Sequence, residues 1–62
     1  MKRTTVCYYA DSGRYLGWEY FKPENLMIYR SWLRSGNGLR INRPSGRKRY
    51  YCSTAISTFL HN

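Results

Sequence analysis

Acidic residues, histidine and cysteine are scarce in this chain of 62 residues. With three acids and one histidine, it offers no serine–histidine–aspartate or cysteine–histidine arrangement for nucleophilic catalysis. Cys7, Cys52 and His61 match no zinc-ligand spacing. The glycine pair at 36–38 follows a predicted helix, whereas a phosphate-binding loop precedes one. We therefore expect no enzyme, no metal site and no cofactor.

Long apolar runs are also missing, and none reaches the length of a signal peptide or a membrane span. Small secreted domains usually carry four or more cysteines, whereas this chain has only Cys7 and Cys52. One bridge between them is an alternative, but we expect two reduced thiols and a cytoplasmic protein.

Positive charge is the property that this chain has in excess. Lys and Arg number 11 against three acids, which gives a net charge of +8. Residues 30–62 carry seven of these cations and no acid. Such a concentration favours a polyanionic partner, because each neutralised phosphate releases condensed counterions. We expect one small nucleic-acid-binding domain over residues 1–62, with a merely soluble basic surface as the alternative reading.

Residues 23–35 predict an amphipathic helix. Pro23 suits the first helical position, and Gly36 is a natural end. Apolar residues recur at helical spacing and predict an inner face formed by Leu26, Tyr29 and Leu33, with Trp32 and Ile28 flanking it.

Residues 39–52 predict a β-hairpin. Apolar and polar residues alternate, and Pro44-Ser45-Gly46 supplies the turn. Of the adjacent pair Tyr50 and Tyr51, one side chain should point inward and the other outward. A short helix is expected to follow over residues 53–62.

Residues 4–21 allow two interpretations. β-formers at 4–10, a turn signal at 11–13 and an aromatic run at 15–21 are consistent with a hairpin. The other reading is an N-terminal arm or strand followed by a short helix at 16–21, and we favour this helical turn.

From residue 16 to residue 60, the order of features resembles that of phage excisionases (recombination directionality factors) and related winged helix-turn-helix domains. The best matches are the run Arg30-Ser31-Trp32-Leu33-Arg34-Ser35-Gly36 and the basic segment Gly46-Arg47-Lys48-Arg49-Tyr50. The resemblance covers about three-quarters of the chain.

The resemblance implies a small α+β fold, namely a winged helix-turn-helix with a short two-stranded wing. Its parts would be an N-terminal arm or strand at 1–15, a helix-turn-helix at 16–36, a wing hairpin at 37–52 and a C-terminal helix at 53–62. If residues 4–21 form a hairpin instead, the alternative is a ββα-ββα arrangement with an N-terminal hairpin.

The implied function is that of a sequence-specific architectural protein that binds double-stranded DNA in site-specific recombination or transcription regulation of a phage or mobile element. A tyrosine recombinase (integrase) would be a partner, self-association on DNA would be cooperative, and the compartment would be the cytoplasm of a bacterial host cell. The helix would enter a major groove and the wing would contact the adjacent minor groove or backbone. The candidate DNA-binding residues are Lys22, Asn25, Arg30, Arg34, Arg40, Arg43, Arg47, Lys48 and Arg49.

Two other functions remain open. An RNA or single-strand binder would use aromatic side chains on a sheet surface, and exposure of Tyr8, Tyr9, Tyr15 or Tyr51 would favour it. A small phage-type inhibitor would dock on an acidic surface of a host protein. We expect Trp18 and Trp32 in the core, with stacking on unpaired bases as the alternative.

Overall fold

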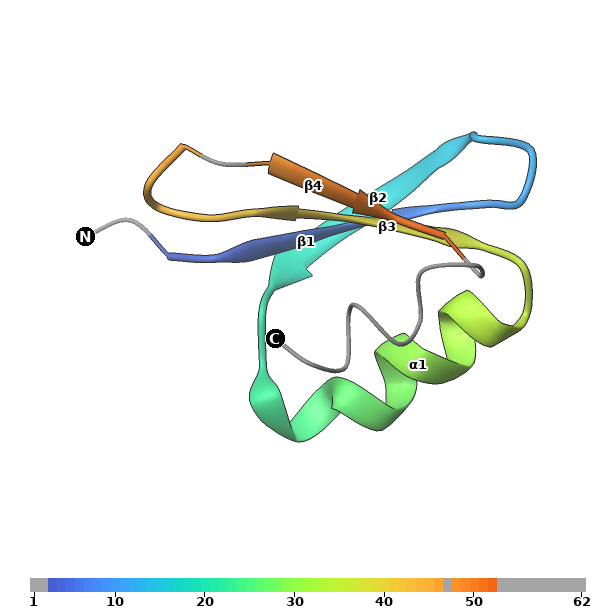
Figure 1. Ribbon diagram of the computed structural model, residues 1–62, viewed down its shortest axis with the longest axis horizontal. Helices are drawn as coiled ribbons and strands as arrows, with labels where there is room; N and C mark the ends of the chain where they lie inside the picture. The colour runs from blue at the N-terminus through green and yellow to red at the C-terminus, as the bar shows by residue number, and fades with distance from the viewer. Residues whose placement is uncertain (1–2, 47, 53–62) are drawn as a thin grey trace.

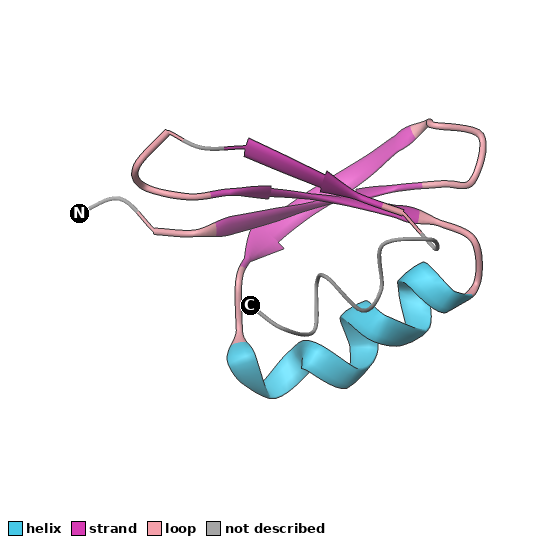
Figure 2. Cartoon of the chain, viewed as in Figure 1, coloured by secondary structure: helices cyan, strands magenta, loops and turns pink. Residues whose placement is uncertain are grey.

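A four-stranded antiparallel sheet with a helix on one face forms the molecule (Figures 1 and 2). The computed structural model describes residues 3–46 and 48–52. The spatial order of the strands is β2-β1-β3-β4. The first strand along the chain, β1, is therefore a central strand, and the last, β4, is an edge strand. In chain order the elements are β1 (Thr5–Tyr9), β2 (Tyr15–Tyr20), the 3-10 turn η1 (Pro23–Asn25), α1 (Leu26–Arg34), β3 (Gly38–Asn42) and β4 (Lys48–Tyr51).

The small α+β class is confirmed, and the helix expected at residues 16–21 is wrong. Residues 16–20 belong to β2, which pairs with β1 from Thr5 opposite Tyr20 to Tyr9 opposite Tyr15. The chain reverses through Asp11-Ser12-Gly13, where the Gly13 amide donates to the Ala10 carbonyl at 2.9 Å. The aromatic run favours strand, and the long pairing with β1 outweighs the weak local preference for a helical turn. The N-terminal hairpin of the alternative arrangement is therefore the one that forms.

The helix predicted at 23–35 is confirmed as η1 continuing into α1. It ends where the sequence indicates, because Gly36 adopts a positive φ of 93° that a side chain would disfavour. The Gly36 amide donates to the Leu33 carbonyl at 3.0 Å, and the Asn37 amide donates to the Trp32 carbonyl at 3.3 Å. These two bonds form a Schellman motif that satisfies the last helical carbonyls.

The hairpin predicted at 39–52 is confirmed as β3 and β4, which pair from Leu39 opposite Tyr51 to Asn42 opposite Lys48. As expected, the two adjacent tyrosines point to opposite sides: Tyr51 is buried, and Tyr50 is exposed. The helix predicted at 53–62 lies outside the described residues.

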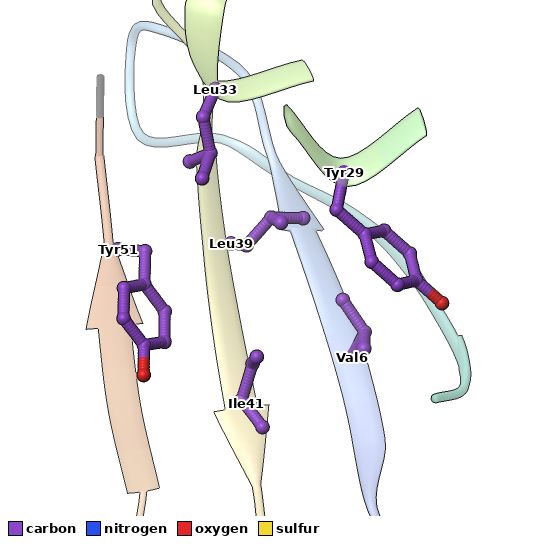
Figure 3. Close-up of a cluster of buried hydrophobic side chains, with 6 residues drawn as sticks. All are labelled: Val6, Tyr29, Leu33, Leu39, Ile41 and Tyr51. Atoms are coloured by element: carbon purple, nitrogen blue, oxygen red, sulfur yellow. The ribbon is translucent and has the colours of Figure 1, made fainter. Parts of the chain in front are cut away.

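The core lies between α1 and one face of the sheet (Figure 3). Trp32 packs against its edge, where the indole Nε1–H donates to the Gly38 carbonyl at 2.9 Å and the ring meets Tyr8 edge to face at 5.5 Å. Leu26, expected on the inner face of the helix, and Ile28, expected beside it, are exposed instead. The buried residues are Val6, Tyr29, Leu33, Leu39, Ile41 and Tyr51.

The sequence predicted two reduced thiols and no membrane-spanning segment. Cys7 and Cys52 are both half-buried and are not joined by a disulfide, and their reduced state stays a prediction. Along the described ranges, no helix has the length and apolar character needed to cross a membrane.

The two tryptophans differ in their contribution to stability, and this difference can be measured by urea denaturation. Trp32→Ala removes a ring packed on the core and a hydrogen bond, so we expect the free energy of unfolding to fall by about 3–5 kcal/mol. Trp18→Ala, on the exposed sheet face, should change it by less than about 1 kcal/mol. Equal losses would contradict the assignment of Trp32 to the core and Trp18 to the surface.

Candidate nucleic-acid interface

Strand β2 has its large apolar side chains on the solvent side, which reverses the usual pattern of a half-buried strand. Glu19 lies opposite Val6, whose side chain is fully buried on the helix side of the sheet. Trp18 lies opposite Cys7 and therefore points to the other side. Trp18 was expected in the core, and that expectation is wrong. The alternation places Gly17 and Glu19 against the helix layer and leaves the aromatic rings exposed.

Register extends this pattern across the whole sheet. Cys7 lies opposite both Trp18 and Arg40, and Arg40 lies opposite Tyr50. Cross-strand partners share a face, so one row on the side away from α1 reads Trp18, Cys7, Arg40, Tyr50. This row has an exposed aromatic ring at each edge strand and a guanidinium between them.

A group of tyrosines occupies the end of this face nearest the β1–β2 loop. The ring of Tyr9 lies 5.6 Å from that of Tyr15 and 5.8 Å from that of Tyr50, both edge to face. The Tyr50 ring lies over Gly38, where an added Cβ atom would be only 2.7 Å from Cζ of the ring. The absence of a side chain at Gly38 thus gives the Tyr50 ring its place on the sheet.

The opposite end of the face is basic. There the row reads Tyr20, Thr5, Asn42 and Lys48. The guanidinium of Arg3 lies over the Tyr20 ring, with Cζ 4.0 Å from the centroid. This end borders the β3–β4 loop, on the same side of the molecule as the start of β1 (Figure 1).

We call this surface the open face, because no described element covers it. Its aromatic side chains are exposed to 55% (Trp18), 52% (Tyr50), 51% (Tyr15) and 41% (Tyr20). It carries three cations, and Glu19, the one acid within the described strands, points to the other side. The open face consists of Arg3, Thr5, Cys7, Tyr9, Tyr15, Trp18, Tyr20, Gly38, Arg40, Asn42, Lys48 and Tyr50.

The helix side holds a polar cluster around Glu19. The Tyr8 hydroxyl donates to Oε2 of Glu19, and the Tyr29 hydroxyl lies 3.4 Å from the same oxygen. The Lys22 amide donates to the Tyr29 hydroxyl at 3.1 Å. Burial raises the pKa of the Tyr8 hydroxyl above its usual value, and the bond to the Glu19 carboxylate raises it further. Burial also raises the pKa of Tyr29. The cluster links β1, β2 and α1, and we assign it a structural role.

The structure separates the DNA-binding residues predicted from the sequence into different surfaces. Arg40 and Lys48 lie on the open face, whereas Arg30 and Arg34 lie on α1, in the layer behind the sheet. Lys22 precedes η1, Asn25 is its last residue, and Arg43 follows β3. Arg49 lies on edge strand β4 opposite Ile41, on the helix side of the sheet. Arg47 lies outside the described residues.

Sequence reasoning missed Arg3, Tyr20 and Gly38 as members of the interface. A signal was present for Tyr20, because an alternating Gly17-Trp18-Glu19-Tyr20 run puts its aromatic residues on one face of a strand. Of the tyrosines whose exposure would favour single-strand binding, Tyr15 is exposed, Tyr9 is half-buried on the open face, and Tyr8 and Tyr51 point to the helix side.

Metal-binding groups are sparse in the described part of the chain, where no three His, Cys, Asp or Glu residues cluster. Comparisons with protein-family models, with curated proteins and with solved structures gave no match.

The raised tyrosine pKa values predict a loss of stability at alkaline pH. Unfolded tyrosine ionises near pH 10, whereas folded Tyr8 and Tyr29 keep their protons above that pH. The free energy of unfolding from these groups should be constant below about pH 10 and fall as the pH rises above it. In urea titrations, Tyr8→Phe should make the fall less steep, by at most about 1.4 kcal/mol per pH unit. The exposed-residue control Tyr15→Phe should leave it unchanged, and equal effects of the two variants would contradict the assignment.

Proposed function

We propose that this chain binds single-stranded nucleic acid on the open face, without catalysis, by stacking unpaired bases on aromatic side chains and neutralising phosphates with basic ones. The observation that carries the proposal is that the large side chains of β2 point to solvent, away from the helix layer. Trp18 and Tyr20 are exposed on the same face as Tyr15, Tyr50 and three cations.

Exposed aromatic rings next to cations match the chemistry of a single strand. Every base has a flat apolar face, and stacking on an aromatic side chain contributes about 1–3 kcal/mol per base. Arg and Lys add attraction to the phosphates, and their charge is not compensated on the open face. A solvent-exposed apolar surface of this extent otherwise costs free energy, so a ligand that covers it is the simplest account of its presence.

A double helix fits the open face less well. Its bases are stacked on each other and do not offer their faces to a protein ring. The major groove is about 12 Å wide and admits a two-stranded ribbon. The outer strands of this sheet are three interstrand spacings apart, which is about 14 Å. The sheet is therefore too broad to enter the groove flat.

A second copy of the chain is also a poor occupant. Two open faces in contact would bring Arg3, Arg40 and Lys48 of each copy together with no strand acid to pair with them. The net charge of +8 on each chain adds a general repulsion. A polyanion removes both costs.

Duplex binding of the excisionase kind is a second candidate, and the β3–β4 hairpin favours it. This hairpin forms where the wing was expected, with Arg43 before its turn and Lys48 and Arg49 after it. Helix α1 would then have to reach a groove with Arg30 and Arg34. Residues 16–21 do not supply the helix that would precede it, so this candidate depends on the hairpin.

Fluorescence anisotropy with labelled RNA, single-stranded DNA and duplex DNA of one sequence tests the proposal. We expect both single strands to bind more tightly than the duplex. Trp18→Ala and Tyr50→Ala should each weaken single-strand binding about five- to 150-fold, which corresponds to one lost stacking contact.

The matched control is Met27→Ala, because Met27 is an exposed apolar side chain on α1, in the layer behind the sheet. This variant should bind like the parent chain. Preference for duplex, with binding lost in Arg34→Ala and retained in Trp18→Ala, would replace the proposal by the second candidate. Failure to bind any of the three nucleic acids would overturn both and leave docking on an acidic protein surface as the remaining account.

A further inference from the structure

The open face is not uniform, and its two ends differ in chemistry. The end next to the β3–β4 loop holds Arg3 and Lys48, and Arg43 follows in the adjoining loop. The end next to the β1–β2 loop holds the rings of Tyr9, Tyr15 and Tyr50. Along β1, the row of Thr5 and the row of Tyr9 are separated by about 13 Å.

Each group extends across several strands. The basic group spans from Arg3, which lies over the Tyr20 ring of β2, to Lys48 on β4. The tyrosine group spans from Tyr15 on β2 through Tyr9 on β1 to Tyr50 on β4. The open face therefore has two stripes, which are both perpendicular to the strands and parallel to each other. We call them the basic stripe and the tyrosine stripe.

An unpaired nucleic-acid strand has the same division, because its phosphates follow one edge and its bases project from the other. We infer that the bound strand crosses the sheet perpendicular to the β-strands, with its phosphates along the basic stripe and its bases directed over the Trp18 row onto the tyrosine stripe. This inference rests on the proposed function and adds the direction and orientation of the ligand.

Contacts within the stripes support this orientation. The Tyr50 ring is held in place before any ligand arrives, because it lies over Gly38 and against Tyr9. A ring that is already positioned loses little conformational freedom when a base stacks on it. Lys48 is an exposed side chain at the start of edge strand β4, where a phosphate can reach it from solvent.

The salt dependence of binding measures the two stripes separately, because only phosphate contacts release counterions. For a single strand the slope of log affinity against log salt changes by about 0.7 per phosphate contact. Arg3→Gln with Lys48→Gln should reduce the slope by about 1.4, measured by anisotropy with a labelled single-stranded DNA. Tyr50→Leu should weaken binding at least about fivefold and leave the slope unchanged.

Arg14→Gln is the matched control for charge. Arg14 is an exposed cation beside the β1–β2 loop, at the end occupied by the tyrosine stripe. Its loss removes one unit of charge from the end where the bases and not the phosphates are expected, so the slope should not change. If Arg14→Gln reduced the slope by about 0.7, as much as each substitution in the Arg3→Gln/Lys48→Gln variant is expected to, the inference would be overturned.

A strand of the same length in which every base is replaced by an abasic site provides the second measurement. At low salt, the Arg3→Gln/Lys48→Gln variant should bind this abasic strand more weakly than the parent chain does. Tyr50→Leu should bind it as tightly as the parent chain does. An effect of Tyr50→Leu that persists on the abasic strand would overturn the orientation. A variant that had merely unfolded would lose both ligands, and this pattern differs from the expected one.

The inference and the proposed function fail in different ways. If the parent chain binds no single strand, the proposed function itself is wrong. If the parent chain binds the strand but the two stripes give equal slopes and equal dependence on bases, binding stands and the orientation alone is rejected.

Discussion

In the described part of the chain, one α-helix of nine residues covers one face of a four-stranded sheet, and the other features of the structure depend on this one-sided packing. Six buried side chains form the core between the two layers. Because the described chain has no second layer, the other face of the sheet meets solvent. Glycine and glutamate of β2 turn toward the helix, and the large rings of the same strand turn toward water. The tyrosine hydroxyls around Glu19 satisfy the carboxylate that this arrangement places against the helix layer.

Charge gives the exposed face its chemical character. A net charge of +8 on 62 residues repels itself, and a bound polyanion relieves that repulsion. The cations of the open face have aromatic neighbours, since Arg3 lies over Tyr20 and Arg40 lies 5.7 Å from the Tyr9 centroid. These contacts position the guanidinium groups without neutralising them. A ligand that binds only the folded chain also stabilises it, and on the proposed function this would offset the free energy lost to exposed rings and repelling cations.

Local signals predicted much of the fold. Helical spacing, a terminal glycine and a hairpin turn located α1, its end at Gly36 and the β3–β4 hairpin, because each of these is determined within a few residues. The segment at 16–21 was predicted wrongly, because its strand is specified by pairing with residues 5–9 and by the orientation of its alternating side chains. Charge counting named Arg40 and Lys48 as candidate binding residues. It could not assign them to one face and Arg30 and Arg34 to another, since that division depends on register and on the side of the sheet that the helix covers.

The same limitation explains why Trp18 was wrongly expected in the core. A tryptophan in a small chain is more often buried than exposed, and only the pairing of Trp18 with Cys7 places it on the solvent side. Strand alternation predicted that one of Tyr50 and Tyr51 points outward, but it could not indicate which one, nor the contact over Gly38 that holds the Tyr50 ring. Residues whose role depends on a neighbouring strand were therefore the ones that sequence reasoning could not place.

The emission of Trp18 during titration with an unlabelled single-stranded RNA tests the central claim most directly. Trp32→Phe leaves Trp18 as the one tryptophan, so its fluorescence reports on the open face alone. If bases stack on this face, the emission should fall in a saturable way with the same midpoint as binding measured by anisotropy. Binding that saturates while the Trp18 emission stays constant would contradict the account.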